Sequence, residues 1–101
     1  MLVISITFCI EDSVADHWLE EVKTRHIPSL LLSGLISEYK LMKLLMEMEN
    51  NGTTYNCQFV LTDENTLSEF ETIHEPQFLA DINKQFARMY GSFKTILQVI
   101  D

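Results

Sequence analysis

The sequence predicts an α+β fold in which two helical regions pack on one face of a four-stranded antiparallel sheet. Segments with the composition and alternation of strands lie at the two ends of the chain and in its middle. Two segments with the spacing of amphipathic helices separate them. An Asn-Gly pair at 51–52 indicates a tight turn between the two central strands. The predicted order is therefore strand, helix, strand, strand, helix, strand.

The first strand is expected over 2–10, which is rich in Ile, Val, Phe and Thr. Its even positions are all large and apolar: Leu2, Ile4, Ile6, Phe8 and Ile10. Its odd positions are smaller and partly polar: Val3, Ser5, Thr7 and Cys9. Because successive side chains of a strand point to opposite faces, the even positions should face the core.

A helix is expected over 14–26, because Ser13 with Asp16 three residues later resembles a capping signal. Its apolar residues recur at helical spacing: Val14, Ala15, Trp18, Leu19 and Val22. Pro28 disfavours helical conformation in the residue before it, so we expect the helix to end at His26. A short second helix should then run from Pro28 to Ser33 and end at Gly34.

Two central strands are expected as a hairpin over 35–49 and 53–62. The segment 35–49 is mostly apolar, and its periodicity is compatible with helix or strand. The turn Asn50-Asn51-Gly52 favours a strand. One face would then carry Leu41 and Leu45, and the other Met42, Leu44, Met46 and Met48. The segment 53–62 alternates clearly, with one apolar face made by Tyr55, Cys57, Phe59 and Leu61.

A second helical region is expected over 64–90, with Asp63 as its cap. One apolar stripe runs along it at steps of three and four: Leu67, Phe70, His74, Phe78, Ile82, Phe86 and Met89. Pro76 predicts a kink or break near His74 and Glu75. Gly91 ends the region, and 92–100 forms the last strand.

This order is the ferredoxin-like βαββαβ arrangement, whose sheet has the strand order 4-1-3-2. The length of 101 residues fits one such domain over 1–101.

Net charge and cysteine usage limit the class of partner. The net charge of −8 comes from 15 acidic and 7 basic residues, so we expect neither nucleic acid nor an anionic membrane as a partner. The apolar start of the chain has no basic residues before it, and no segment approaches the ~18 apolar residues of a membrane helix. We therefore expect a cytoplasmic protein with reduced thiols. Cys9 and Cys57 should lie on different sheet faces and form no disulfide.

The sheet face opposite the helices would leave large apolar side chains of 35–49 in water. Such a patch normally marks an interface. Burying about 400 Å² of it would contribute roughly 10 kcal/mol before the cost of association. We therefore expect a homodimer in which the open sheet faces pack together. The alternative is a monomer whose strand is shorter than 35–49.

Candidate chemistry is confined to four residues. The sequence contains no nucleotide, zinc or hydrolase motif, so no catalytic residue, metal site or cofactor is assigned. His26 and His74 should both face inward, towards Trp18 and Tyr55. These four could line one ligand pocket, mostly apolar with few polar groups. Alternatively, each His precedes a proline and satisfies a backbone carbonyl at a helix end.

Several short motifs resemble one known family. They are Thr7, Trp18, the His26-Ile27-Pro28 step, Gly52-Thr53-Thr54-Tyr55 with Gln58, Phe86 and the closing FKTILQVI. On these residues the chain resembles a family of bacterial proteins, of about this length, that is known as a domain of unknown function. The resemblance covers nearly the whole chain and implies a dimeric α+β barrel without an assigned activity. Lys94 and Gln98 stand where Arg and Glu are expected in such sequences, so the resemblance carries no ionic role over to these two positions.

Two functional hypotheses follow, and the sequence leaves open whether the chain is an enzyme. The first is a non-enzymatic homodimeric module that binds a small molecule or a protein. The alternative is a cofactor-independent enzyme, resembling antibiotic monooxygenases and haem-degrading proteins, with its pocket between helices and sheet. This alternative rests on fold analogy. A cavity between the helices and the sheet would favour it.

Overall fold

The computed structural model describes residues 1–46 and 52–101. Four strands form one antiparallel sheet in the order β2-β3-β1-β4, which is the predicted 4-1-3-2 order counted from the other edge. The strands are β1 (Leu2–Glu11), β2 (Glu38–Lys43), β3 (Gly52–Leu61) and β4 (Tyr90–Gln98). The predicted ferredoxin-like fold is confirmed.

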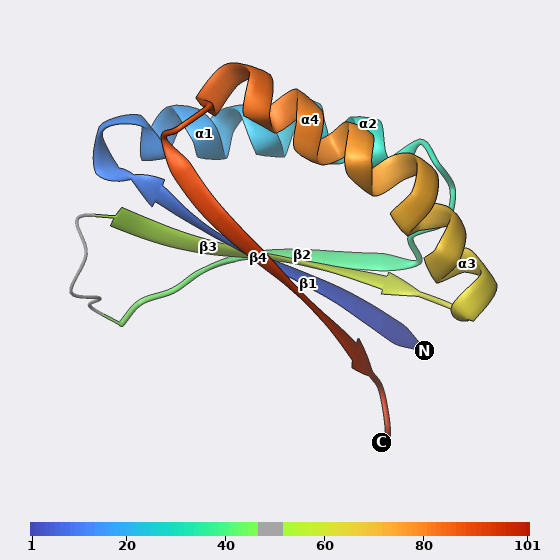
Figure 1. Ribbon diagram of the computed structural model, residues 1–101. Coiled ribbons are helices and arrows are strands. Elements are labelled where there is room, and N and C mark those ends of the chain that lie inside the picture. Colours follow the sequence, from blue (N-terminus) through green and yellow to red (C-terminus); the bar gives the residue numbers. More distant parts are fainter. Residues whose placement is uncertain (47–51) are drawn as a thin grey trace.

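The helices all lie on one face of this sheet (Figure 1). The first helical region consists of η1 (Asp12–Val14), α1 (Ala15–Glu21), η2 (Val22–His26) and α2 (Ile27–Leu31). The second consists of α3 (Glu64–Glu69), η3 (Phe70–His74) and α4 (Glu75–Phe86). We call the opposite side, which no helix of the described ranges covers, the open face.

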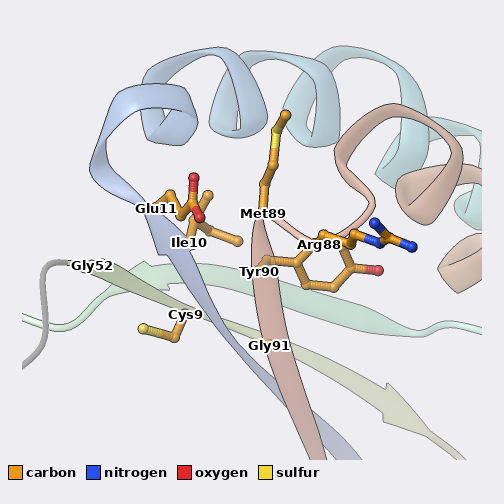
Figure 2. A pocket seen from close by; sticks show the side chains of 8 residues that line it. All are labelled: Cys9, Ile10, Glu11, Gly52, Arg88, Met89, Tyr90 and Gly91. Carbon is orange, nitrogen blue, oxygen red and sulfur yellow. The ribbon is translucent and has the colours of Figure 1, made fainter.

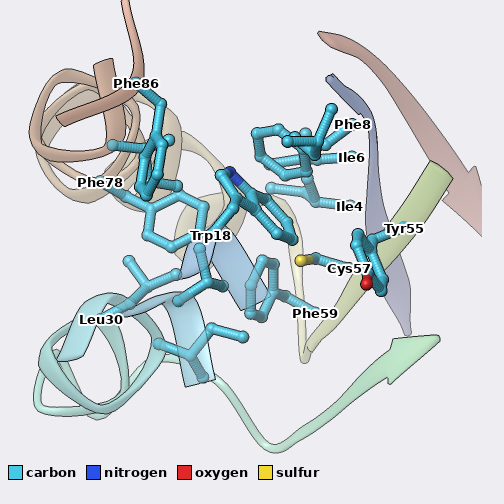
Figure 3. Close-up of a cluster of buried hydrophobic side chains, with 14 of the residues drawn as sticks. Ile4, Ile6, Phe8, Trp18, Leu30, Tyr55, Cys57, Phe59, Phe78 and Phe86 are labelled. Carbon is cyan, nitrogen blue, oxygen red and sulfur yellow. The ribbon is translucent and has the colours of Figure 1, made fainter. Parts of the chain in front are cut away.

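The core lies between the helices and the sheet, and the predicted alternation of β1 and β3 is confirmed. The even positions of β1 from Ile4 to Ile10 are buried, and so are the odd positions of β3 from Tyr55 to Leu61. In the strand register Phe8 stands opposite Tyr55, and Ile6 opposite Cys57. Figure 3 shows Trp18 in the middle of this cluster. Neither Cys9 nor Cys57 is in a disulfide.

The prediction that the first helix ends at His26 is wrong, because Ile27 is helical and the chain continues into α2. A π-helical turn, η2, makes this continuation feasible. The Ile27 N–H donates to the Val22 carbonyl, five residues earlier. In a regular α-helix the ring of Pro28 would clash with the carbonyl four residues before it, and we attribute the wider turn to this conflict.

A π-helical turn also precedes the second proline, Pro76. Pro76 lies in the first turn of α4, and η3 ends two residues before it, with the Glu75 N–H donating to the Phe70 carbonyl. The irregularity expected near His74 and Glu75 is therefore a π turn. Both histidines are the last residue of such a turn, within the repeated pattern Thr-x-His-x-Pro at 24–28 and 72–76.

Several predicted boundaries change. Ser13 is inside η1 and caps no helix, because α1 begins only at Ala15. Asp63 is the cap of α3, as predicted, and its Oδ1 accepts from the Thr66 N–H at 2.8 Å. The second helical region ends at Phe86 rather than 90, because Arg88 has a positive φ of 68° that no helix accommodates. The last strand begins at Tyr90, so Gly91 is inside it.

The predicted strand over 35–49 is also too long. β2 covers Glu38–Lys43, and the Leu44 N–H still donates to the Thr54 carbonyl at 2.9 Å. Leu45 and Met46 follow outside the strand and are exposed. β2 is an edge strand, and β3 is its one partner among the described strands. A longer β2 would therefore bury little additional apolar surface of its own side chains. Met48 and the Asn50-Asn51 pair lie outside the described residues.

Candidate functional site

Trp18 and Tyr55 are brought together, but in the filled core. Their rings stack at a centroid distance of 5.2 Å and an interplanar angle of 17°. Trp18 is 0% exposed and also contacts Phe8, with ring centroids 5.0 Å apart. Figure 3 shows its indole enclosed by side chains from both layers. Its Nε1 has no hydrogen-bond partner among the described residues. The location of Trp18 is that of a core residue.

His26 is buried and held by the second helical region. Its Nε2 lies 2.5 Å from Oε1 of Gln85. The amide nitrogen of Gln85 donates to Oε1 of Glu21 at 2.8 Å, so the Gln85 oxygen must face the imidazole and accept from it. His26 Nε2 therefore carries a hydrogen. The hydrogen-bond partner of His26 is thus a side chain, and not the backbone carbonyl considered from sequence.

Glu21 completes this chain of hydrogen bonds. Arg25 donates to the same Glu21 oxygen at 3.2 Å. The pKa of Glu21 is lowered, mainly by the hydrogen bond from Gln85 and further by Arg25. Sequence analysis missed Gln85 and Glu21, because they are 64 positions apart and meet only when the helical regions pack.

His26 and His74 line one small cavity of about 100 Å³ between the two helical regions. The residues around it are His26, Ser29, Leu30, His74, Gln77, Phe78 and Asp81. Neither Trp18 nor Tyr55 belongs to this wall. The four predicted pocket residues are therefore divided between two places: a stacked aromatic pair in the core and a pair of histidines between helices. The cavity is smaller than the ~300–1,000 Å³ of typical ligand sites.

A larger groove lies between the first helical region and the edge strand β2. Its volume is about 520 Å³. The residues that line it are Leu19, Lys23, Ile27, Tyr39, Lys40, Leu41, Met42, Lys43 and Tyr55. We call it the β2 groove. It is the cavity between helices and sheet that the sequence left open, and Tyr55 is the predicted pocket residue on its wall.

Tyr55 contributes a phenol group to the β2 groove. Burial raises its pKa, and the charge of Asp16 raises it further. The hydroxyl is therefore protonated at neutral pH, and it makes no hydrogen bond within ranges 1–46 and 52–101. In Figure 3 the phenol oxygen points towards the side of β2. A ligand in the groove would find a hydrogen-bond donor there.

A second depression, shown in Figure 2, lies where β1 ends and β4 begins. Its volume is about 260 Å³. It is lined by Cys9, Ile10, Glu11, Gly52, Arg88, Met89, Tyr90 and Gly91. The Glu11 N–H donates to the Met89 carbonyl at 2.9 Å, which ties the two strand ends together. The geometry explains this depression as the corner where the chain enters the last strand.

Lys94 has an ionic role. It lies on the helix side of β4, and its Nζ is 2.6 Å from Oε2 of Glu71 and 3.0 Å from Oε2 of Glu75. The hydrogen bond to Glu71 is the main cause that raises the pKa of Lys94. The ionic role that the resemblance left open at Lys94 is therefore present in the structure. The spacing of Glu71 and Glu75 by one helical turn was the available sequence signal.

The open face has a polar centre and an apolar border. Asn56 donates to Ser5 Oγ at 2.9 Å and to Thr7 Oγ1 at 3.0 Å, which joins β3 to β1 at the centre. Exposed apolar side chains lie on the two edge strands and just after β2: Met42, Leu44, Phe93 and Leu97. The sequence predicted the contribution of Met42 and Leu44 and missed that of Phe93 and Leu97.

No group of three or more His, Cys, Asp or Glu side chains in the described ranges could hold a metal ion. None of the described helices is both long and apolar enough to cross a membrane.

Comparison with known proteins places the chain in a family. The model of the family described as "Domain of unknown function (DUF4286)" matches residues 1–100, so the chain belongs to this family. No curated protein matches the chain.

Solved structures share the fold at low sequence identity. HapK from Hahella chejuensis has a TM-score of 0.69 and 13% identity, covering 99% of this chain and 93% of that chain. A dimeric ferredoxin-like protein from an uncultured marine organism has a TM-score of 0.71 and 9% identity, covering 100% and 96%. SnoaB, a cofactor-independent oxygenase from Streptomyces nogalater, has a TM-score of 0.63 and 17% identity, covering 99% and 93%. At these identities the likeness shows the fold.

Proposed function

We propose that this protein is a homodimeric α+β barrel, formed by residues 1–101 as one domain, that binds a small molecule in the β2 groove. The observation that carries the binding function is the groove itself. Its volume of about 520 Å³ lies within the range of ligand sites. Its walls combine apolar side chains such as Leu19, Ile27 and Leu41 with the Tyr55 phenol.

The homodimer is supported by the open face. Its edges carry exposed Phe93 and Leu97 on one strand, and Met42 and Leu44 at the other. This face has a cavity of about 460 Å³ between Leu44 and Phe93, and side chains of a second copy could pack into it. The dimeric ferredoxin-like neighbour has the same fold. We also propose that the protein is cytoplasmic, as expected from the sequence.

The binding function is tested by thermal denaturation of the protein with a panel of small metabolites. A ligand present at 100 times its Kd should stabilise the protein by about 2.7 kcal/mol, which raises Tm by several degrees. Tyr55→Phe, which removes one hydroxyl from the groove, should weaken the shift. The matched control is Tyr90→Phe, whose hydroxyl lies near Asn83 and not in the β2 groove. An equal loss in both variants, or no shift with any compound, contradicts the proposal.

The second candidate function is a cofactor-independent oxygenase that uses Trp18, His26 and His74. What supports it is the buried indole Nε1 of Trp18, which has no partner among the described residues. Such unsatisfied groups are uncommon in cores and frequent at functional sites. Oxygen uptake with a panel of polyphenols and haem tests it. Turnover that survives both Trp18→Phe and His74→Ala would exclude these residues as its basis.

A further inference from the structure

The basic residues of this acidic chain are concentrated at the β2 groove. The chain has seven Lys and Arg residues against fifteen acids. Three of the seven, Lys23, Lys40 and Lys43, line the groove, whereas none of the described residues that line it is acidic. The residues that line the groove therefore carry only positive charge in an acidic chain, and Asp16, whose charge acts on Tyr55, is not among them.

Within the part of the chain that the structure describes, these three lysines also have no ion-pair partner. Arg25 pairs with Glu21, and Lys94 pairs with Glu71 and Glu75. In ranges 1–46 and 52–101 no carboxylate forms an ion pair with Lys23, Lys40 or Lys43. Like charges that share a groove repel one another, so binding an anion would be favourable there.

The geometry of the two flanking elements directs two of these lysines to the same groove. Leu19, Lys23 and Ile27 follow one another at steps of four, so they lie along one side of the first helical region. In the strand register Lys43 stands opposite Tyr55 and Leu41 opposite Cys57, which places Lys43 on the helix side of β2. Lys40 stands opposite Gln58, which places it on the open face of β2, so it lines only the rim of the groove.

We propose that the β2 groove binds a small hydrophobic carboxylate, with its apolar body on Leu19, Ile27 and Leu41 and its carboxylate between Lys23, Lys43 and the Tyr55 hydroxyl. This inference rests on the proposed binding function and specifies the class of its ligand. Ammonium groups bind a compact anion as point charges, and the apolar lining of the groove favours an anion that carries a hydrophobic body. The raised pKa of Tyr55 keeps its hydroxyl a donor to such a ligand.

The test uses three probes of one shape and different charge: 2-naphthoate, 2-naphthamide and 2-naphthylmethylammonium. Their affinities are measured by isothermal titration calorimetry at neutral pH, in low and in moderate salt. We expect the carboxylate to bind at least about tenfold more tightly than the amide, and the preference to decrease in salt because the lysines are exposed. The ammonium probe should bind least.

Variants locate the effect. The double substitution Lys23→Gln and Lys43→Gln should weaken naphthoate about tenfold and leave naphthamide unchanged. The control is Lys84→Gln, which removes one positive charge, half the change in the double variant, from a lysine outside the groove. Because all three positions are exposed, the substitutions should leave folding intact, which circular dichroism checks.

Two outcomes overturn the inference and separate it from the proposed function. If naphthamide binds as tightly as naphthoate and the lysine variants change neither, the groove binds ligands without selecting anions; the proposed function then stands and the inference is wrong. If none of the three probes binds, the inference is also wrong, and the metabolite panel with Tyr55→Phe decides the proposed function separately. If Lys84→Gln lowers the logarithm of the naphthoate affinity by half as much as the double variant, or more, the effect follows net charge, and the assignment of the anion to the groove is wrong.

Discussion

Truncating Phe93 on the open face should weaken a homodimer strongly. Phe93 is 65% exposed in the single chain, on the face that we propose as the interface. In an isologous dimer each substitution occurs twice. Phe93→Ala therefore removes two large apolar side chains from one interface. The matched control is Ile73→Ala, which removes an apolar side chain that is 58% exposed on the helical side.

The magnitude follows from the exposed area. A Phe side chain can bury about 200 Å², so 65% exposure leaves about 130 Å² that a partner could cover. At about 25 cal/mol per Å², full coverage of that area contributes roughly 3 kcal/mol per protomer. If a partner covers only half of this area, the loss summed over both protomers is still roughly 3 kcal/mol. Phe93→Ala should therefore raise the dissociation constant of the dimer about 100-fold.

Sedimentation equilibrium over a range of concentrations measures this constant. The wild-type protein and Ile73→Ala should be dimers at micromolar concentration, and Phe93→Ala should dissociate in that range. A wild-type protein that is a monomer at micromolar concentration would refute the proposed homodimer. A dimer whose dissociation constant is unchanged by Phe93→Ala would refute the assignment of the open face.

Three further predictions concern stability and reactivity. Lys94→Met leaves the buried Glu75 without its cation, so the free energy of unfolding in urea should fall by about 2 kcal/mol. Because the pKa of Lys94 is raised above its ordinary 10.5, the stabilisation should be complete below that pH and be lost as the pH rises through the folded value. A difference between wild type and variant that does not decrease as the pH is raised above 10.5 would contradict this. Burial raises the pKa of Cys57 to about 12, so alkylation of the native thiol by iodoacetamide at pH 8 should be about a thousandfold slower than that of an ordinary thiol. Mass spectrometry of the labelled peptides checks this, and equal rates for native and unfolded protein would contradict it. Asp63→Ala should lower Tm, whereas Asp63→Asn should retain most of the cap. Since the hydrogen bond from the Thr66 backbone lowers the pKa of Asp63, the advantage of wild type over Asp63→Ala should be present above pH 3.8 and disappear as the pH falls through the folded value. Thermal denaturation over a series of pH values from neutral downwards measures this loss.

Sequence patterns predicted the parts of the fold that depend on local chain geometry. The two-residue alternation of β1 and β3 identified the buried face from Ile4 to Ile10 and from Tyr55 to Leu61. The order of the six elements predicted the sheet order. The boundaries that failed are those at Ser13, at Pro28, at the end of the second helical region and at the edge strand. At Pro28 a rare π turn replaced the expected helix end, and at β2 the pairing ended early.

The candidate site was less predictable, because it combines residues that meet only through packing. Trp18 and Tyr55 face inward as expected, but they fill the core instead of lining a cavity with the histidines. The hydrogen-bond partner of His26, Gln85, lies 59 positions away. No periodicity links Lys23 to Lys43, which face one groove from a helix and a strand.

The sequence by itself therefore determined the elements, the buried faces of β1 and β3, and the acidic balance of the chain. These follow from the alternation of side chains along a strand, their recurrence on one side of a helix, and counts of charge. The tertiary structure decided where the π turns, the Glu21–Gln85–His26 contacts, the Lys94 ion pairs and the β2 groove lie. Each depends on the distance between elements far apart in sequence, which the packing of two helical regions on one sheet face determines.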